Sequence, residues 1–241
     1  MDISYENNFH EWAASLRGFE REQIPFATAL ALTDTAKDIK AEHVRLLPLV
    51  FDRPTRFTMN SLMVTPATKY KLQATVFFKE NNTQKYGKHY LMPQVQGGGR
   101  PHKRFEYWLI QHGLMMSDEY AVPARGLKLN AFGNISSGTI VQILSQLAAS
   151  PDATQWETKT SRKRAGSSRA RYFAPQQGSN LHRGIWRRLG KKVEPVLIFV
   201  KSVRYEVRYR FFDISRDTAD ARLHLNWAAA FDRAVATSRG R

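Results

Sequence analysis

Residues 184–212 read GIWRRLGKKVEPVLIFVKSVRYEVRYRFF and carry the strongest strand pattern in the chain. Two apolar segments, 184–189 and 195–201, flank a short polar connection that contains Gly190, an arrangement typical of a β-hairpin. The next segment, 203–212, alternates apolar or aromatic residues with Arg and Glu. Such alternation indicates a strand with one buried face, so this region predicts an antiparallel sheet.

The aromatic residues of this alternating segment allow two interpretations. Tyr205, Tyr209 and Phe211 stand opposite arginines, and aromatic side chains on a basic sheet can stack against the bases of single-stranded nucleic acid. The glycine-containing aromatic signature of RNA-binding sheets does not accompany them. The sequence therefore favours a core position beneath a helix.

Helices are predicted at both ends of the chain. A helix over about 23–47 has Pro25 in its first turn and ends at Pro48, and a shorter helix over about 8–19 precedes it. A final helix over about 217–237 is predicted to face inward with Ala221, Leu225, Ala228, Ala229 and Phe231. The expected fold class is α+β: an antiparallel β-sheet packed by N-terminal and C-terminal amphipathic helices.

The middle of the chain predicts shorter elements. Strands are expected over about 60–65, 71–79, 88–94 and 122–129, and helices over about 103–112 and 136–149. Gly97–Gly99 can form an anion-binding nest, but the residues after them lack the Lys-Ser/Thr pair of a nucleotide-binding loop. The simpler interpretation is a loop between a strand and a helix.

Composition narrows the possible functions. The 241 residues include 37 Lys and Arg against 21 Asp and Glu, a net charge of +16, and no Cys. A field of this sign attracts polyanions or acidic protein surfaces. The lack of Cys excludes disulfide scaffolds, Cys-ligated zinc, iron–sulfur clusters and a thiol nucleophile. The N-terminal residues resemble no signal peptide, and the most apolar segment, 195–200, is shorter than the roughly 20 residues of a membrane-spanning helix, so no membrane span is expected.

The positive charge is concentrated in one region. Residues 155–192 contain eleven Lys or Arg and a single acidic residue, Glu157. Because this stretch is also rich in Ser, Gly and Gln, residues 151–182 are expected to form a basic flexible arm. The arm would separate residues 1–150 from residues 183–241, which complete the same domain. The candidate polyanion- or partner-binding residues are Lys159, Arg162, Lys163, Arg164, Arg169, Arg171, Arg187, Arg188, Lys191 and Lys192.

No catalytic pattern is evident. The seven histidines show no metal-binding spacing. Asp213 and Asp217 are four residues apart but straddle a predicted helix start, and no serine lies in a nucleophile motif. We therefore expect no enzymatic activity, no metal and no cofactor, and rank a basic hydrolase or nuclease behind a binding or structural protein.

The order of these parts resembles a family of viral proteins. The similarity is carried by FATALALTDTA at 26–36, YLMPQVQGGGR at 90–100 followed by KRFE at 103–106, GIWRR at 184–188 and PVLIFV at 195–200. The chain is similar to the minor tail and tail-completion proteins of tailed bacteriophages, particularly the minor tail protein Z group. The resemblance covers the order of elements along most of the chain, which is longer than that group through residues 114–182.

The resemblance implies a structural virion protein. It would be a ring- or layer-forming subunit at the head–tail junction or tail that supports assembly and the DNA exit channel. Its partners would be neighbouring copies in a ring, other head–tail or tail proteins and lumenal DNA, and it would be made in the host bacterial cytoplasm. The alternative is a basic nucleic-acid-binding protein without catalytic activity.

Overall fold

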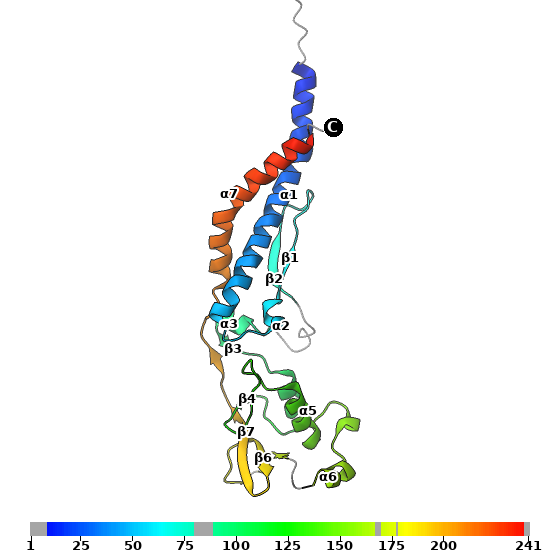
Figure 1. The fold of residues 1–241 in the computed structure, drawn as a ribbon, viewed down its shortest axis with the longest axis vertical. Helices are drawn as coiled ribbons and strands as arrows, with labels where there is room; N and C mark the ends of the chain where they lie inside the picture. Colours follow the sequence, from blue (N-terminus) through cyan, green and yellow to red (C-terminus); the bar gives the residue numbers. More distant parts are fainter. Residues whose placement is uncertain (1–8, 80–88, 167–169, 177, 239–241) are drawn as a thin grey trace, which may run out of the picture. The chain divides into compact units, whose positions relative to one another are not determined.

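Two units divide the chain in the computed structural model, which describes residues 9–79, 89–166, 170–176 and 178–238 (Figure 1). Unit 1 combines residues 1–79 with residues 209–241, and unit 2 comprises residues 80–208. The chain therefore leaves unit 1, forms unit 2, and returns to complete unit 1. The units therefore change after residues 79 and 208, whereas the sequence predicted boundaries after residues 150 and 182.

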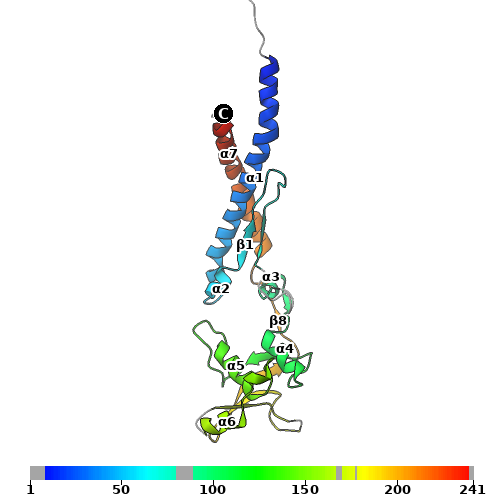
Figure 2. The ribbon, with the colours of Figure 1, turned by 90° about the vertical axis from the view of Figure 1, so that its right-hand side faces the viewer.

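Unit 1 is built on two long antiparallel helices, α1 (Phe9–Val50) and α7 (Phe211–Ser238), which lie side by side in Figures 1 and 2. Their direction follows from two contacts: the His43 ring bonds Ser215, whereas Asp34 pairs with Arg233 near the other end of α7. The helices meet through alanine, because Ala27, Ala31, Ala230 and Ala234 form one buried cluster. Such small side chains let two helix backbones approach closely.

A β-hairpin packs on α1. Strand β1 (Leu62–Thr65) pairs antiparallel with β2 (Thr75–Phe78), and a single-turn helix, α2 (Arg56–Met59), precedes them. The hydroxyl of Thr33 accepts a hydrogen bond from the Ala67 amide at 3.0 Å, which ties the hairpin connection to α1.

Unit 2 contains a four-stranded antiparallel sheet. Its strands are β4 (Tyr120–Pro123), β5 (Arg171–Phe173), β6 (Gly184–Leu189) and β7 (Lys192–Val200), in the spatial order β4-β7-β6-β5. Two helices, α4 (Arg104–Gln111) and α5 (Ser137–Gln146), contribute to its core. The shared apolar cluster includes Phe105 and Leu109 from α4, Ile143 and Leu144 from α5, and Ile185, Val196 and Leu197 from the sheet.

Shorter elements complete unit 2. They are α3 (Met92–Gln96), β3 (Gly98–Gly99) paired with β8 (Arg204–Tyr205), the 3₁₀ turn η2 (Ala153–Gln155), and α6 (Lys159–Ala165).

The α+β class is confirmed, with a helix at each end of the chain. The predicted hairpin is β6–β7, whose turn has Gly190 at a φ of 60°, in the left-handed region that glycine tolerates. The helices at 103–112 and 136–149 appear as α4 and α5, and Ser136 caps α5 by accepting from the Thr139 amide. The packing differs in detail: α1 and α7 contact chiefly each other, while α4 and α5 contribute to the core of the four-stranded sheet.

Several predicted elements were wrong at the ends of the chain. The helices at 8–19 and 23–47 are one continuous helix, with Pro25 and Pro48 inside it. The alternating segment 203–212 forms only the two-residue strand β8, and α7 begins at Phe211 instead of Asp217. Its predicted inward residues Ala221, Leu225, Ala228 and Ala229 are exposed.

Corrections also apply to the middle of the chain. The strand expected over 88–94 is replaced from Met92 by α3, and residue 88 lies outside the described residues. Strand β2 covers only Thr75–Phe78 of the expected 71–79, and β4 begins before the expected 122–129 and shares only residues 122–123 with it. Gly98 and Gly99 pair with β8 instead of forming a free loop, and a Cβ on Gly97 would lie 3.3 Å from the Tyr205 carbonyl oxygen. The close approach of two backbones accounts for Gly97, and Gly98 has a φ of 85°, in the left-handed region that glycine tolerates.

The expected arm over 151–182 contains η2, α6 and β5 within its described residues. The Gln146 side chain joins β5 to α5: its oxygen accepts from the Tyr172 amide at 2.8 Å and its nitrogen donates to the Ala170 carbonyl at 3.2 Å. Nearer α5, the Ser145 hydroxyl donates to the Gln155 carbonyl at 2.5 Å. Polar contacts of this kind supply the ordering that the apolar content of the sequence did not predict.

Candidate functional site

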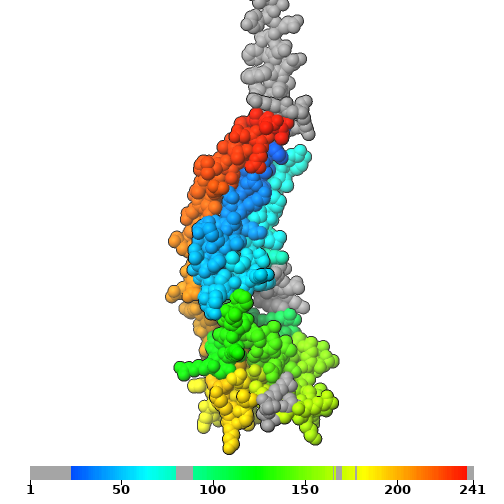
Figure 3. Space-filling view, in the orientation of Figure 1, coloured from blue at the N-terminus to red at the C-terminus, as the bar shows by residue number. Residues whose placement is uncertain are grey.

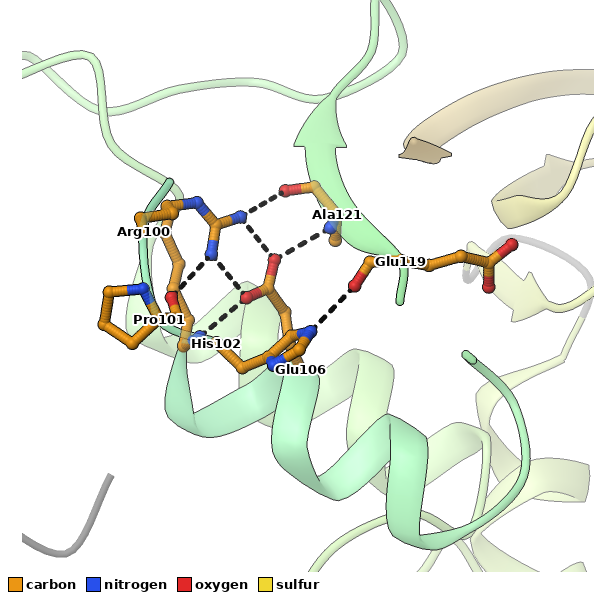
Figure 4. A network of polar contacts seen from close by, with 7 residues as sticks. Arg100, Pro101, His102, Glu106, Glu119 and Ala121 are labelled. Carbon is orange, nitrogen blue, oxygen red and sulfur yellow. Dashed lines mark hydrogen bonds and ion pairs between the residues drawn. The ribbon is translucent and has the colours of Figure 1, made fainter. Parts of the chain in front are cut away.

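A buried ion pair fixes the start of α4. The guanidinium of Arg100 donates two parallel hydrogen bonds to the Glu106 carboxylate, at 2.6 and 2.5 Å, as Figure 4 shows. Glu106 is fully buried and also accepts from the backbone amides of Lys103 and Ala121. Burial alone would raise the pKa of Glu106, but the hydrogen bonds from Arg100 and these amides hold it below its ordinary value. The pair therefore stays ionised and joins α4 to β4.

A second ion pair lies beside the first. The Glu119 carboxylate accepts from Arg183 at 2.7 and 2.9 Å and from the Met116 amide. The His102 ring bonds the Glu119 carbonyl at 2.9 Å (Figure 4) and stacks on Tyr120. The hydrogen bonds from Arg183 are the main reason that the pKa of Glu119 is lowered. These contacts fasten the segment before β4 to the segment before β6.

A cavity of about 560 Å³ lies next to this framework. Its apolar walls come from α4, α5 and the neighbouring loops: Phe105, Trp108, Ile135, Ile140, Val141, Leu144 and Pro151. Lys103 and Arg104 lie in the same wall, together with the uncharged polar residues Asn134, Ser137, Ser150 and Gln155. The cavity thus combines an apolar lining with two cations at the start of α4.

The two cations of the cavity have no carboxylate of their own within the part of the chain that the structure describes. Glu106 is the nearest acidic residue in sequence, and Arg100 and the two amides already occupy both of its oxygens. Although Lys103 keeps part of its surface in solvent, desolvation by the surrounding protein lowers its pKa, and the Arg100 charge lowers it further, while Glu106 opposes them. Lys103 and Arg104 remain exposed to solvent. An anion entering the cavity would meet both.

The predicted basic residues fall into two groups. Lys159, Arg162, Lys163 and Arg164 are exposed on α6, three of them in its last turn, where cations are favoured by the helix dipole. Arg188 and Lys191 are exposed on and beyond β6. The groups are joined because Arg171 donates to the Arg162 carbonyl at 2.7 Å and faces Arg188 across β5 and β6.

Some of the predicted site residues form contacts within unit 2 that stabilise the fold. Arg171 pairs with Glu157 at 3.1 Å, and Arg187 and Lys192 both pair with Glu194. Arg188 lies over the Phe173 ring at 5.5 Å. Arg169 lies outside the described residues. We define the basic surface as the six predicted site residues that are exposed and form no ion pair among the described residues: Lys159, Arg162, Lys163, Arg164, Arg188 and Lys191.

Unit 1 holds a buried histidine that sequence reasoning did not single out. The His43 ring bonds the Ser215 hydroxyl at 2.9 Å and the Tyr209 hydroxyl at 2.8 Å, and it stacks on Phe211. The Ser215 hydroxyl donates its proton to the Phe211 carbonyl at 2.8 Å. His43 Nε2 must therefore donate to Ser215, and Nδ1 must accept from Tyr209. Because the serine proton points away from His43, the cluster connects α1 to α7 and does not activate a nucleophile.

The buried positions of His43 and Tyr209 fix their protonation. Burial lowers the pKa of His43 to about 4 and raises the pKa of Tyr209. Both groups are neutral at physiological pH, as the hydrogen-bond pattern requires.

Asp213 and Asp217, the acidic pair considered in the sequence, lie in the first turns of α7, and Asp213 pairs with Arg210 at 2.8 Å. Among the described residues no group of three His, Asp or Glu side chains is placed to hold a metal ion. In the same described residues, no helix has both the length and the apolar character needed to cross a membrane.

Comparison with known proteins returned no family model, no curated protein and no solved structure that matches this chain.

The sequence pointed to only part of this site. The sequence analysis singled out the segment that ends at Arg100 and KRFE at 103–106, but it did not predict that Glu106 is buried. The available indication was a glutamate at the third position of a helix whose neighbours, Phe105 and Leu109, are apolar. The cavity depends on the approach of α4 and α5, which no local pattern encodes.

Proposed function

We propose that the chain is a structural virion protein of a tailed bacteriophage, a ring- or layer-forming subunit at the head–tail junction or tail. In this role it would contact neighbouring copies and other tail or head–tail proteins and contribute to the DNA exit channel. The sequence resemblance suggested this function, and the distribution of apolar residues in unit 1 supports it.

The distribution of large and small apolar residues in unit 1 carries the proposal. Among its described side chains, six of the ten buried apolar residues are alanines: Ala27, Ala29, Ala31, Ala36, Ala230 and Ala234. Large apolar side chains lie outside, including Leu225 at 50% exposure and Trp227 at 39%. A domain that functions alone gains stability by burying its large side chains. Exposed large side chains around a small-residue interior favour a surface that is covered on assembly.

The exposed residues of α7 include a defined row. Leu223 and Trp227 are four residues apart and therefore lie on one side of the helix. Trp227 stacks on Phe231, which continues the row by four residues, at 5.2 Å. We define these three residues, of which Leu223 and Trp227 are exposed and Phe231 is half-buried, as the apolar row of α7. Aromatic residues of this kind are enriched at the centres of protein interfaces.

The basic surface of unit 2 supports a second candidate function, nucleic-acid binding. A nucleic-acid-binding protein without catalytic activity would use the same six cations on phosphates. In a virion those cations would meet lumenal DNA or an acidic face of a neighbouring subunit. The two functions make different demands on unit 1, because a free nucleic-acid-binding protein has no need for the exposed apolar row.

Quantitative mass spectrometry of purified virions tests the proposal, using a phage whose genome encodes the chain. A structural subunit will be present at a fixed number of copies per particle after extensive washing and nuclease treatment. A free nucleic-acid-binding protein will remain in the host lysate. Absence from washed virions that still infect would overturn the proposed function.

A further inference from the structure

We propose that the cavity between α4 and α5 binds an amphipathic anion, namely a free medium-chain carboxylic acid. The apolar chain would lie among the side chains of α4 and α5, and the carboxylate would meet Lys103 and Arg104. The inference concerns unit 2 alone and does not depend on the proposed virion role.

The shape and lining of the cavity favour a small apolar body. A volume of about 560 Å³ is within the range of pockets that hold small molecules. Trp108 and Ile140 are half-buried residues of the lining, and Phe105 and Leu144 connect it to the core of unit 2. These four side chains come from two helices whose residues share the core of unit 2. An apolar chain entering it would remove its own surface and that of the lining from water.

The charged residues that line the cavity favour a ligand with a negative charge. Both ionisable groups of the lining, Lys103 and Arg104, are cations, and no carboxylate belongs to it. Glu106, the acidic residue that could have neutralised them, is committed to Arg100 through both oxygens. Ser137, in the first turn of α5, also lines the cavity, so the positive end of the α5 dipole adds to this field. A carboxylate head group is the chemistry that this arrangement complements.

Isothermal titration calorimetry of the full chain with decanoate, below its micellar range, measures the binding. Decyltrimethylammonium carries the same chain length with the opposite charge, and acetate carries the carboxylate without the chain. We expect decanoate to bind at one site per chain, decyltrimethylammonium to bind at least about tenfold more weakly, and acetate not to bind. N-acetyl-Leu-Leu tests whether a peptide carboxyl terminus is the true occupant.

Four variants locate the site. Val141 is 56% exposed at the cavity, so Val141→Trp should block it without disturbing the core, and decanoate binding should be lost. Lys103→Met should weaken binding by about tenfold, whereas Lys71→Met, a matched change at an exposed position of unit 1 outside the cavity, should leave it unchanged. Leu72→Asp, at a 48% exposed position of unit 1, controls for adsorption to exposed apolar side chains and should also have no effect.

The proposal is overturned if decanoate and decyltrimethylammonium bind equally, or if Val141→Trp binds decanoate like the wild type while keeping its melting temperature. It is also overturned if N-acetyl-Leu-Leu binds more tightly than decanoate, because the occupant would then be a peptide. None of these outcomes changes the number of copies in virions, so this test and that of the proposed function fail independently.

Discussion

Buried polar groups fix the local geometry at the residue scale, and the Arg100–Glu106 pair is the main example. Its side chains are 8% and 0% exposed, so neither charge can be hydrated if its partner is lost. The pair gains from two parallel hydrogen bonds, and two further amides complete the shell of Glu106. Removing one partner should lower the free energy of unfolding by far more than removing both.

We predict that Arg100→Met lowers the free energy of unfolding by about 3–5 kcal/mol, because it leaves the Glu106 carboxylate buried without its cation. Urea denaturation followed by circular dichroism measures the change. Arg104→Met, at an exposed neighbouring position, should cost less than about 0.5 kcal/mol. The double variant Arg100→Met with Glu106→Leu should recover part of the loss, and a double variant worse than the sum of both single changes would contradict this account.

His43 makes the stability of unit 1 depend on pH. Its pKa is about 4 in the folded chain and about 6.5 when unfolded, so the unfolded state binds the proton more readily. Stability is therefore complete above about pH 6.5 and is lost as the pH falls toward 4, by up to about 3 kcal/mol.

This loss should be visible as a falling melting temperature between about pH 6.5 and 4, over and above the effect of carboxylate titration. His43→Gln should flatten that part of the profile, whereas His224→Gln, at an exposed position of α7, should retain the wild-type slope. Parallel profiles for wild type and His43→Gln would show that His43 does not resist protonation in the fold.

Close contact between α1 and α7 dominates unit 1 at the element scale. Ala230 is completely buried against α1, while the adjacent Ala229 is exposed. In the space-filling view the α7 surface runs directly beside α1 (Figure 3). The interface has little space for a larger side chain.

We expect Ala230→Leu to destabilise unit 1 by about 1–3 kcal/mol through overpacking. Ala229→Leu adds the same atoms on the solvent side and should change stability by less than about 0.5 kcal/mol. Thermal unfolding of the two variants separates them. Equal melting temperatures would mean that the α1–α7 interface tolerates a larger separation than the structure indicates.

The elements that the sequence predicted well are those whose information is local. The β6–β7 hairpin depends on a glycine turn between apolar segments, and α5 depends on the Ser136 cap and an apolar stripe. The prediction of the inner face of α7 was wrong because α7 contacts α1 through alanines and polar groups. One example is Asn226, which donates a hydrogen bond to Asp38 at 2.9 Å. Hydrophobic periodicity does not detect a face of that kind.

The candidate site shows the same limit. The basic residues of α6 were recognisable from composition, but the ion pairs of Arg171 and Arg187 depend on Glu157 and Glu194 being brought close by the fold. Segment 203–212 has the alternation of a strand, yet only Arg204–Tyr205 form one, while Tyr209 is buried, as the sequence favoured, between His43 and the aromatic ring of Phe78. Tertiary contacts override the local pattern there.

The whole molecule combines two units with different surfaces. Unit 1 has an alanine-rich interior and the exposed apolar row of α7, and unit 2 has the basic surface and the α4–α5 cavity. The chain enters unit 2 after Lys79 and returns at Tyr209. In the proposed role, the apolar row would contact a protein neighbour, while the basic surface would face an acidic subunit or DNA.

Native mass spectrometry of the purified chain, alone and with Trp227→Asp or Ala221→Asp, tests the central claim most directly. Trp227 lies in the apolar row, whereas Ala221 is exposed about 120° around α7 from it, so both variants add the same charge at different faces. The account predicts a discrete homo-oligomer for wild type and Ala221→Asp, and a folded monomer for Trp227→Asp. A wild-type chain that stays monomeric at all concentrations, or an oligomer that Trp227→Asp leaves intact, would contradict it.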